Sequence, residues 1–111
     1  EERGIVAYDV LVNQCNMSAV DFMKLVSENP AKLYGMYPKK GTLAVGSDGD
    51  ITIVDKSVEH VLSKESAHTK ADYIPYEGLS VTGKVRDVIL RGHHVVQDGS
   101  LTESYLGECI P

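Results

Sequence analysis

The chain has 111 residues, of which 42% are hydrophobic and 24% charged, and its 11 basic and 16 acidic side chains give a net charge of −5. This length fits one domain or one piece of a larger domain, and the composition is that of an ordinary globular chain. The negative charge argues against a nucleic-acid-binding protein, and no apolar run approaches the roughly 20 residues that a membrane span needs.

The first predicted element covers Gly4 to Asn13, where almost every residue is apolar and only Asp9 interrupts the run. If this segment is a helix, it is apolar nearly all round and needs packing partners on several sides. Its β-branched residues leave a strand as an open alternative, because periodicity alone does not separate the two. We favour the helix because a helical pattern follows directly.

The second predicted element begins at Ser18, a good N-cap with Asp21 three residues later. Apolar residues then recur at helical spacing as far as residue 26. A separate short helix is predicted next, with Asn29 as its cap, Pro30 at its first position and Gly35 closing it.

From residue 38 onward the pattern is that of short strands separated by Gly and Asp. A polar connector at 38–41 leads to predicted strands at 42–45, 51–55, 58–62, 79–90 and 94–97. Turn chemistry lies at 46–50, 91–93 and 98–99, and residues 63–78 predict an ordered loop. Four or five short strands are consistent with a small sandwich or an open barrel.

Metal binding is the most specific function that the residue types suggest, because the chain has four histidines: His60, His68, His93 and His94. No H-x-H, H-E-x-x-H or C-x-x-C spacing is present, so no standard zinc template is met. We interpret the histidines as surface or hairpin residues. The Gly/Asp cluster at 46–50 predicts a β-turn rather than a calcium loop.

Cys15 and Cys109 lie far apart in the sequence and form no metal or redox motif. They are predicted to be free thiols of a reducing cytoplasm. There is no nucleophile elbow and no phosphate-binding glycine loop. The residues alone therefore predict no catalytic constellation.

Two adjacent blocks carry a family resemblance: NPAKLYG at 29–35 and KGTLAVGSDGD at 40–50. Together they resemble the carboxy-terminal region of cyclic amidohydrolases. The later blocks YIPYEG at 73–78, VTGKV at 81–85 and VILRG at 88–92 are most similar to the dihydropyrimidinase or D-hydantoinase branch. The tail at 105–111 resembles a variant of that family's closing segment.

The resemblance implies an α+β fold that is part of a composite amidohydrolase. Residues 1–38 would be two or three helices from the end of a TIM-barrel domain, and residues 39–111 a small β-sandwich-like accessory domain. The implied partners are the missing barrel and further copies of the parent, since the family forms homotetramers. No nucleic acid or membrane partner is implied, and the expected location is the cytoplasm.

The implied activity is ring-opening hydrolysis of a cyclic amide by a binuclear metal centre, expected to hold zinc. The family's metal ligands and substrate contacts lie upstream of the matching region. The resemblance therefore assigns no catalytic, substrate-binding or metal-binding residue and no cofactor to this chain, which is expected to be a carboxy-terminal fragment that is inert alone.

Two other functions remain open at this point. Collapsin-response-mediator-type assembly proteins share this carboxy-terminal sequence pattern but lack the metal ligands. The sequences at 29–35 and 81–87 are closer to those of the enzymes. An unrelated small β-rich binding module is the third interpretation.

Overall fold

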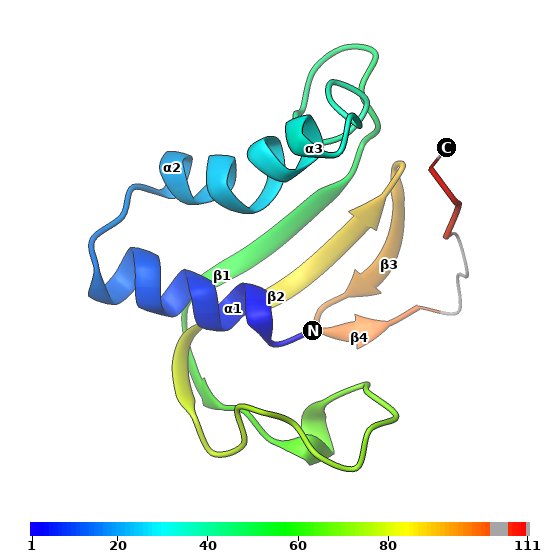
Figure 1. Ribbon diagram of the computed structural model, residues 1–111. Coiled ribbons are helices and arrows are strands. Elements are labelled where there is room, and N and C mark those ends of the chain that lie inside the picture. The colour runs from blue at the N-terminus through cyan, green and yellow to red at the C-terminus, as the bar shows by residue number, and fades with distance from the viewer. Residues whose placement is uncertain (103–106, 111) are drawn as a thin grey trace.

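The computed structural model describes residues 1–102 and 107–110, and it shows two helical rods beside one antiparallel sheet (Figure 1). The first rod consists of α1 (Arg3–Tyr8) and the π-helical segment η1 (Asp9–Gln14). The second rod consists of α2 (Ala19–Met23), the π-helical segment η2 (Lys24–Glu28) and α3 (Asn29–Leu33). No helix among the described residues is long and apolar enough to cross a membrane.

The first rod confirms the helix predicted over 4–13. Its buried side chains Ile5 and Tyr8 lie in the hydrophobic core. In the second half the helix widens, and the N–H of Cys15 donates to the carbonyl of Val10, five residues back, at 3.0 Å. The apolar segment is thus a helix that packs on the chain's own sheet.

The second rod begins as predicted, since the N–H of Asp21 donates to Ser18 Oγ at 3.1 Å. The short helix predicted after Asn29 is present as α3, with Pro30 in its first turn, but the predicted cap at Asn29 and the separation from the preceding helix are wrong. Asn29 has helical angles, φ −64° and ψ −45°, and continues η2 directly into α3. Pro30 removes one donor, but tertiary packing outweighs this local signal, because both Phe22 and Ala31 on the same rod are buried.

The predicted closure at Gly35 is confirmed, with φ +72°. Met36 N–H donates to the carbonyl of Ala31 at 2.8 Å, and Gly35 N–H donates to that of Lys32 at 3.3 Å. These two bonds form a Schellman motif, which satisfies the last carbonyls of the helix.

The sheet has the order β1-β2-β3-β4, with every neighbouring pair antiparallel. Its strands are β1 (Ile51–Val61), β2 (Ser80–Leu90), β3 (His93–Gln97) and β4 (Ser100–Leu101). The two strands predicted at 51–55 and 58–62 are joined into β1. They meet at an irregularity where the Ser57 N–H and hydroxyl both donate to Asp55 Oδ1.

The strand predicted at 42–45 is wrong. Gly41 and Gly46, which flank it, have positive φ values of +83° and +92° and turn the chain at both ends. The N–H of Ser47 closes a turn on the carbonyl of Ala44, and Val45 is fully exposed. Apolar residues alone predicted this strand, but the glycines prevent the chain from extending here.

Both predicted hairpin bends are confirmed. Arg91 and Gly92 connect β2 to β3 with φ values of +47° and +82°, and Asp98 and Gly99 connect β3 to β4 with +49° and +76°. Two successive positive values are those of a type I′ turn, whose twist matches that of the strands. The loop predicted at 63–78 is also present and contains the short 3-10 helix η3 (Lys64–Ser66).

The hydrophobic core joins both rods to the sheet and to the 63–78 loop. The rings of Tyr8 and Phe22 meet edge to face, with centroids 5.5 Å apart. The other buried members are Ile5, Leu62, Ile74 and Val81. The α+β class is confirmed, and all strands of the described residues belong to one sheet. The division into a barrel end at 1–38 and a sandwich-like domain at 39–111 stays a prediction.

Candidate functional site

The four histidines lie in separate places and are not gathered into one site. His60 lies on β1, His93 and His94 begin β3, and His68 lies in the loop after η3. Among residues 1–102 and 107–110, no group of three or more His, Cys, Asp or Glu side chains is arranged to hold a metal ion. The absence of a metal site from the complete chain stays a prediction, because the remaining residues are outside the described part.

His60 differs from the other histidines because its Nδ1 atom is buried and has no hydrogen-bond partner in the described structure. Burial lowers the pKa of the His60 imidazole, and the positive charge of Lys84 lowers it further. The ring is therefore neutral near pH 7, as suits a half-buried strand residue.

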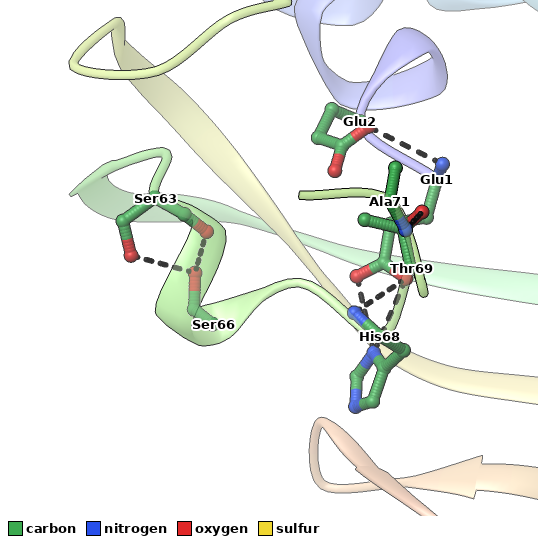
Figure 2. A network of polar contacts seen from close by, with 7 residues as sticks. All are labelled: Glu1, Glu2, Ser63, Ser66, His68, Thr69 and Ala71. Carbon is green, nitrogen blue, oxygen red and sulfur yellow. Dashed lines mark hydrogen bonds and ion pairs between the residues drawn. The ribbon is translucent and has the colours of Figure 1, made fainter. Parts of the chain in front are cut away.

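His68 belongs to a polar network between the first residues of the chain and the 63–78 loop (Figure 2). The Glu1 carboxylate accepts the His68 backbone N–H at 3.2 Å and lies 3.1 Å from His68 Nδ1. Nearby, the Ser66 hydroxyl donates to the Ser63 carbonyl at 3.0 Å. All of these groups are exposed, so the network ties the loop to the first rod and encloses no reaction space.

Lys40, Asp48 and Asp50, called the Lys40 cluster below, form the most connected group of charges in the described structure. The Lys40 ammonium lies 2.8 Å from Asp48 and 2.5 Å from Asp50. Hydrogen bonds to Asp48 and then Asp50 raise the pKa of Lys40. Burial acts to raise the pKa of Asp50, but the bonds from Lys40 and from the Arg91 N–H outweigh it and lower that pKa.

The Lys40 cluster fixes the 40–50 loop to the first hairpin. Asp50 Oδ1 accepts the N–H of Arg91 at 2.9 Å, and the N–H of Gly92 donates to the carbonyl of Gly49 at 3.0 Å. In the sequence, residues 40–50 are recognised only as a family signature. The local signal for the Lys40 cluster is a lysine followed by two acidic residues in a glycine-rich segment.

An open groove of about 780 Å³ lies between the second rod and residues 40–52. Its apolar lining includes Met23, Val26, Ala31, Leu43 and Ile51, and the Lys40 cluster lies along it. Met23 and Leu43 are 56% and 65% exposed. The volume is that of a small-molecule site, but the lining of exposed apolar side chains favours contact with a protein surface.

Cys15 and Cys109 are both free, as predicted, and both are exposed. Neither thiol shares a metal-binding group with His, Asp or Glu side chains in the part of the chain that is described.

The sequence pattern of the amidohydrolase family matches residues 2–95. The chain belongs to this family. It is 44% identical to the D-hydantoinase of Ralstonia pickettii over 108 residues, covering 97% of the chain and 22% of that protein. It is 43% identical to the D-hydantoinase of Geobacillus stearothermophilus over 98 residues, covering 88% of the chain and 21% of that protein.

Solved structures agree with this family assignment. A D-hydantoinase structure, 43% identical, superimposes with a TM-score of 0.86 over 90% of the chain and 22% of its own length. The dihydropyrimidinase of Brevibacillus agri, 39% identical, gives 0.85 over 88% of the chain and 21% of its own. This amidohydrolase chain thus spans about a fifth of the length of its relatives, and the predicted resemblance is confirmed.

Proposed function

We propose that the chain is the supporting carboxy-terminal portion of a metal-dependent cyclic amidohydrolase of the hydantoinase or dihydropyrimidinase type. The observation that carries this proposal is the 44% identity over 97% of the chain to a D-hydantoinase of which the chain spans only 22%. The parent would open a cyclic amide such as a 5-substituted hydantoin or a dihydropyrimidine by hydrolysis of its C–N bond.

In the parent, the metal ions, which we expect to be zinc, would activate a water molecule and polarise the substrate carbonyl. The described residues do not fit such a centre, because the four histidines lie apart on β1, on β3 and in the loop. No catalytic step is therefore assigned to this chain, which is proposed to be inert alone. Its role would be to close one side of the barrel and to support the accessory domain.

The exposed apolar surface supports a barrel partner. The second rod presents Val20, Met23 and Leu33 at 63%, 56% and 79% exposure. β1 lies at one edge of the sheet, with its first residues Ile51 and Thr52 in the groove. Exposed apolar faces and long edge strands are usually covered in native proteins. We propose that residues 1–38 pack against the parent's barrel and that other strands complete the sheet of 39–111.

The parent would self-associate, as its family's tetramers do, and act in the cytoplasm without nucleic acid or membrane partners. The net charge of −5 supports the exclusion of nucleic acid. A collapsin-response-mediator-type assembly protein remains the alternative, but the relatives named above are hydantoinases, so it is not favoured.

The complete reading frame that contains this segment tests the proposal. Its full product should contain an upstream H-x-H pair and a metal-bridging lysine, and it should open hydantoin or dihydrouracil with bound metal. A product that lacks these ligands and has no hydrolase activity would favour the assembly protein instead.

A further inference from the structure

The carboxylate of Asp9 lies buried where the first rod meets β2. Its Oδ1 accepts Asn13 Nδ2 at 2.8 Å and the backbone N–H of Thr82 at 3.1 Å, and its Oδ2 accepts Gln14 Nε2 at 2.8 Å. Asn13 Nδ2 also donates to the Thr82 carbonyl at 2.8 Å. The rod therefore bonds to both backbone groups of a single strand residue.

The π-helical geometry of η1 explains how one carboxylate holds two amides of its own helix. In an α-helix the residue four positions on lies over residue i, whereas the wider π turn also brings the residue five positions on to the same face. Asn13 and Gln14 stand four and five positions after Asp9, and both reach it. A regular α-helix would turn Gln14 away.

Thr82 is a residue of β2 that the short strand β3 does not reach. The β2–β3 pairing involves only residues 88–90 of β2, whereas Thr82 is paired with Glu59 of β1. Asp9 and Asn13 thus act on Thr82 as a neighbouring strand would, accepting its N–H and donating to its carbonyl. This is a way to protect a strand edge with side chains of a helix.

We propose that Asp9 is an acid-labile clamp that holds the first rod on β2 at Thr82. The ionised carboxylate only accepts hydrogen bonds and satisfies three donors. Protonation removes the charge that strengthens all three hydrogen bonds and turns one acceptor oxygen into an O–H donor, so the hold on Thr82 weakens. The rod then opens more readily at Thr82 while the β1–β2–β3 ladder stays paired. This inference is independent of the parent's activity.

Among the described residues, the causes of the Asp9 pKa shift are hydrogen bonds and burial. Hydrogen bonds from Asn13 and then from Thr82 lower the pKa of Asp9, burial opposes them, and Gln14 lowers it further. Of the charged residues on the surrounding elements, Glu59 accepts the Ser80 hydroxyl, and Asp21 on α2 is exposed and accepts from Ser18. Lys84 stands two positions from Thr82 along β2 and is paired with Asp55 of β1.

An NMR titration of the 111-residue chain from about pH 7 to about pH 2 tests the clamp. The Thr82 amide and the side-chain amides of Asn13 and Gln14 should shift with one shared midpoint, below the usual aspartate value of 3.8. Hydrogen-exchange protection at Thr82 should fall by about tenfold through that midpoint, while protection at Val88 in the β2–β3 ladder is retained.

Two variants complete the test. Asp9→Asn should reduce Thr82 protection at neutral pH by about tenfold and remove its pH dependence, since an uncharged amide oxygen accepts more weakly than a carboxylate and the amide adds a donor. Asp21→Asn is the matched control and should leave Thr82 unchanged. Separate midpoints for the three amides would overturn the proposal, and so would loss of Val88 protection together with Thr82. The titration of the unmodified chain decides the question even if Asp9→Asn does not fold.

Discussion

At Gly83 the first rod lies close against the sheet. A Cβ atom built at this position would lie 3.1 Å from Ile5 Cδ1 and 3.1 Å from Tyr8 Cδ1, and the residue has φ +125°. Both features disfavour any side chain. We therefore predict that Gly83→Ala strongly destabilises the chain.

The expected magnitude has two parts. A side chain at φ +125°, outside the left-handed helical region, costs about 1–3 kcal/mol, and overpacking a filled core costs about 1–3 kcal/mol more. Gly35→Ala is the matched control, because Gly35 also has positive φ, +72°, but nothing lies within 4 Å of its built Cβ. Gly35→Ala should lose only about 1–2 kcal/mol, the cost of a side chain in the left-handed region.

Urea unfolding of both variants separates the two parts. The free energy of unfolding of Gly83→Ala should fall below that of Gly35→Ala by about 1–3 kcal/mol. A difference smaller than about 0.5 kcal/mol would refute the close packing of α1 on β2, because that is the range of ordinary surface substitutions. Second-site Ile5→Val should restore part of the loss in Gly83→Ala, since it shortens the contacting side chain.

Three further outcomes follow from the fold. Ser18→Ala removes the acceptor for the Asp21 N–H and should lower the free energy of unfolding by about 1 kcal/mol in a urea titration. Phe22→Ala removes the ring that meets Tyr8 and should cost about 3–5 kcal/mol, whereas Phe22→Leu should cost less than about 1.5 kcal/mol. The pKa of Asp87 is lowered by Arg86 and then by the Asp98 N–H, so its contribution to stability is present above the usual aspartate value and lost as pH falls through the lower folded value. Asp87→Asn should flatten the acid limb of the stability–pH curve, whereas an unchanged limb would show that Asp87 is not responsible.

The elements that the sequence predicted correctly are those whose determinants are local. The cap at Ser18 and the closure at Gly35 depend on single side chains and backbone angles, and both hairpins depend on dipeptides that tolerate positive φ. The failures at 42–45 and at Asn29 have the opposite origin. In the first, two glycines redirect an apolar run, and in the second, packing of the second rod outweighs a proline signal.

The polar contacts that organise the molecule were beyond sequence reasoning. Asp9 and Thr82 stand 73 positions apart, and Asp50 and Arg91 stand 41 apart. Neither pairing leaves a local signature, because it depends on how the rods and the hairpin meet in space. The family motif indicated that residues 40–50 matter, but only the structure shows Lys40 bonded to Asp48 and Asp50.

The central claim is that the reactive residues of the parent hydrolase lie outside this chain. The most direct measurement is a hydantoin and dihydrouracil ring-opening assay on the purified 111-residue chain supplemented with zinc, with the metal content determined after dialysis. Hydrolysis should be no faster than in buffer, and the dialysed chain should retain no stoichiometric zinc. Turnover above that background, or one or two zinc ions retained per chain, would contradict the claim.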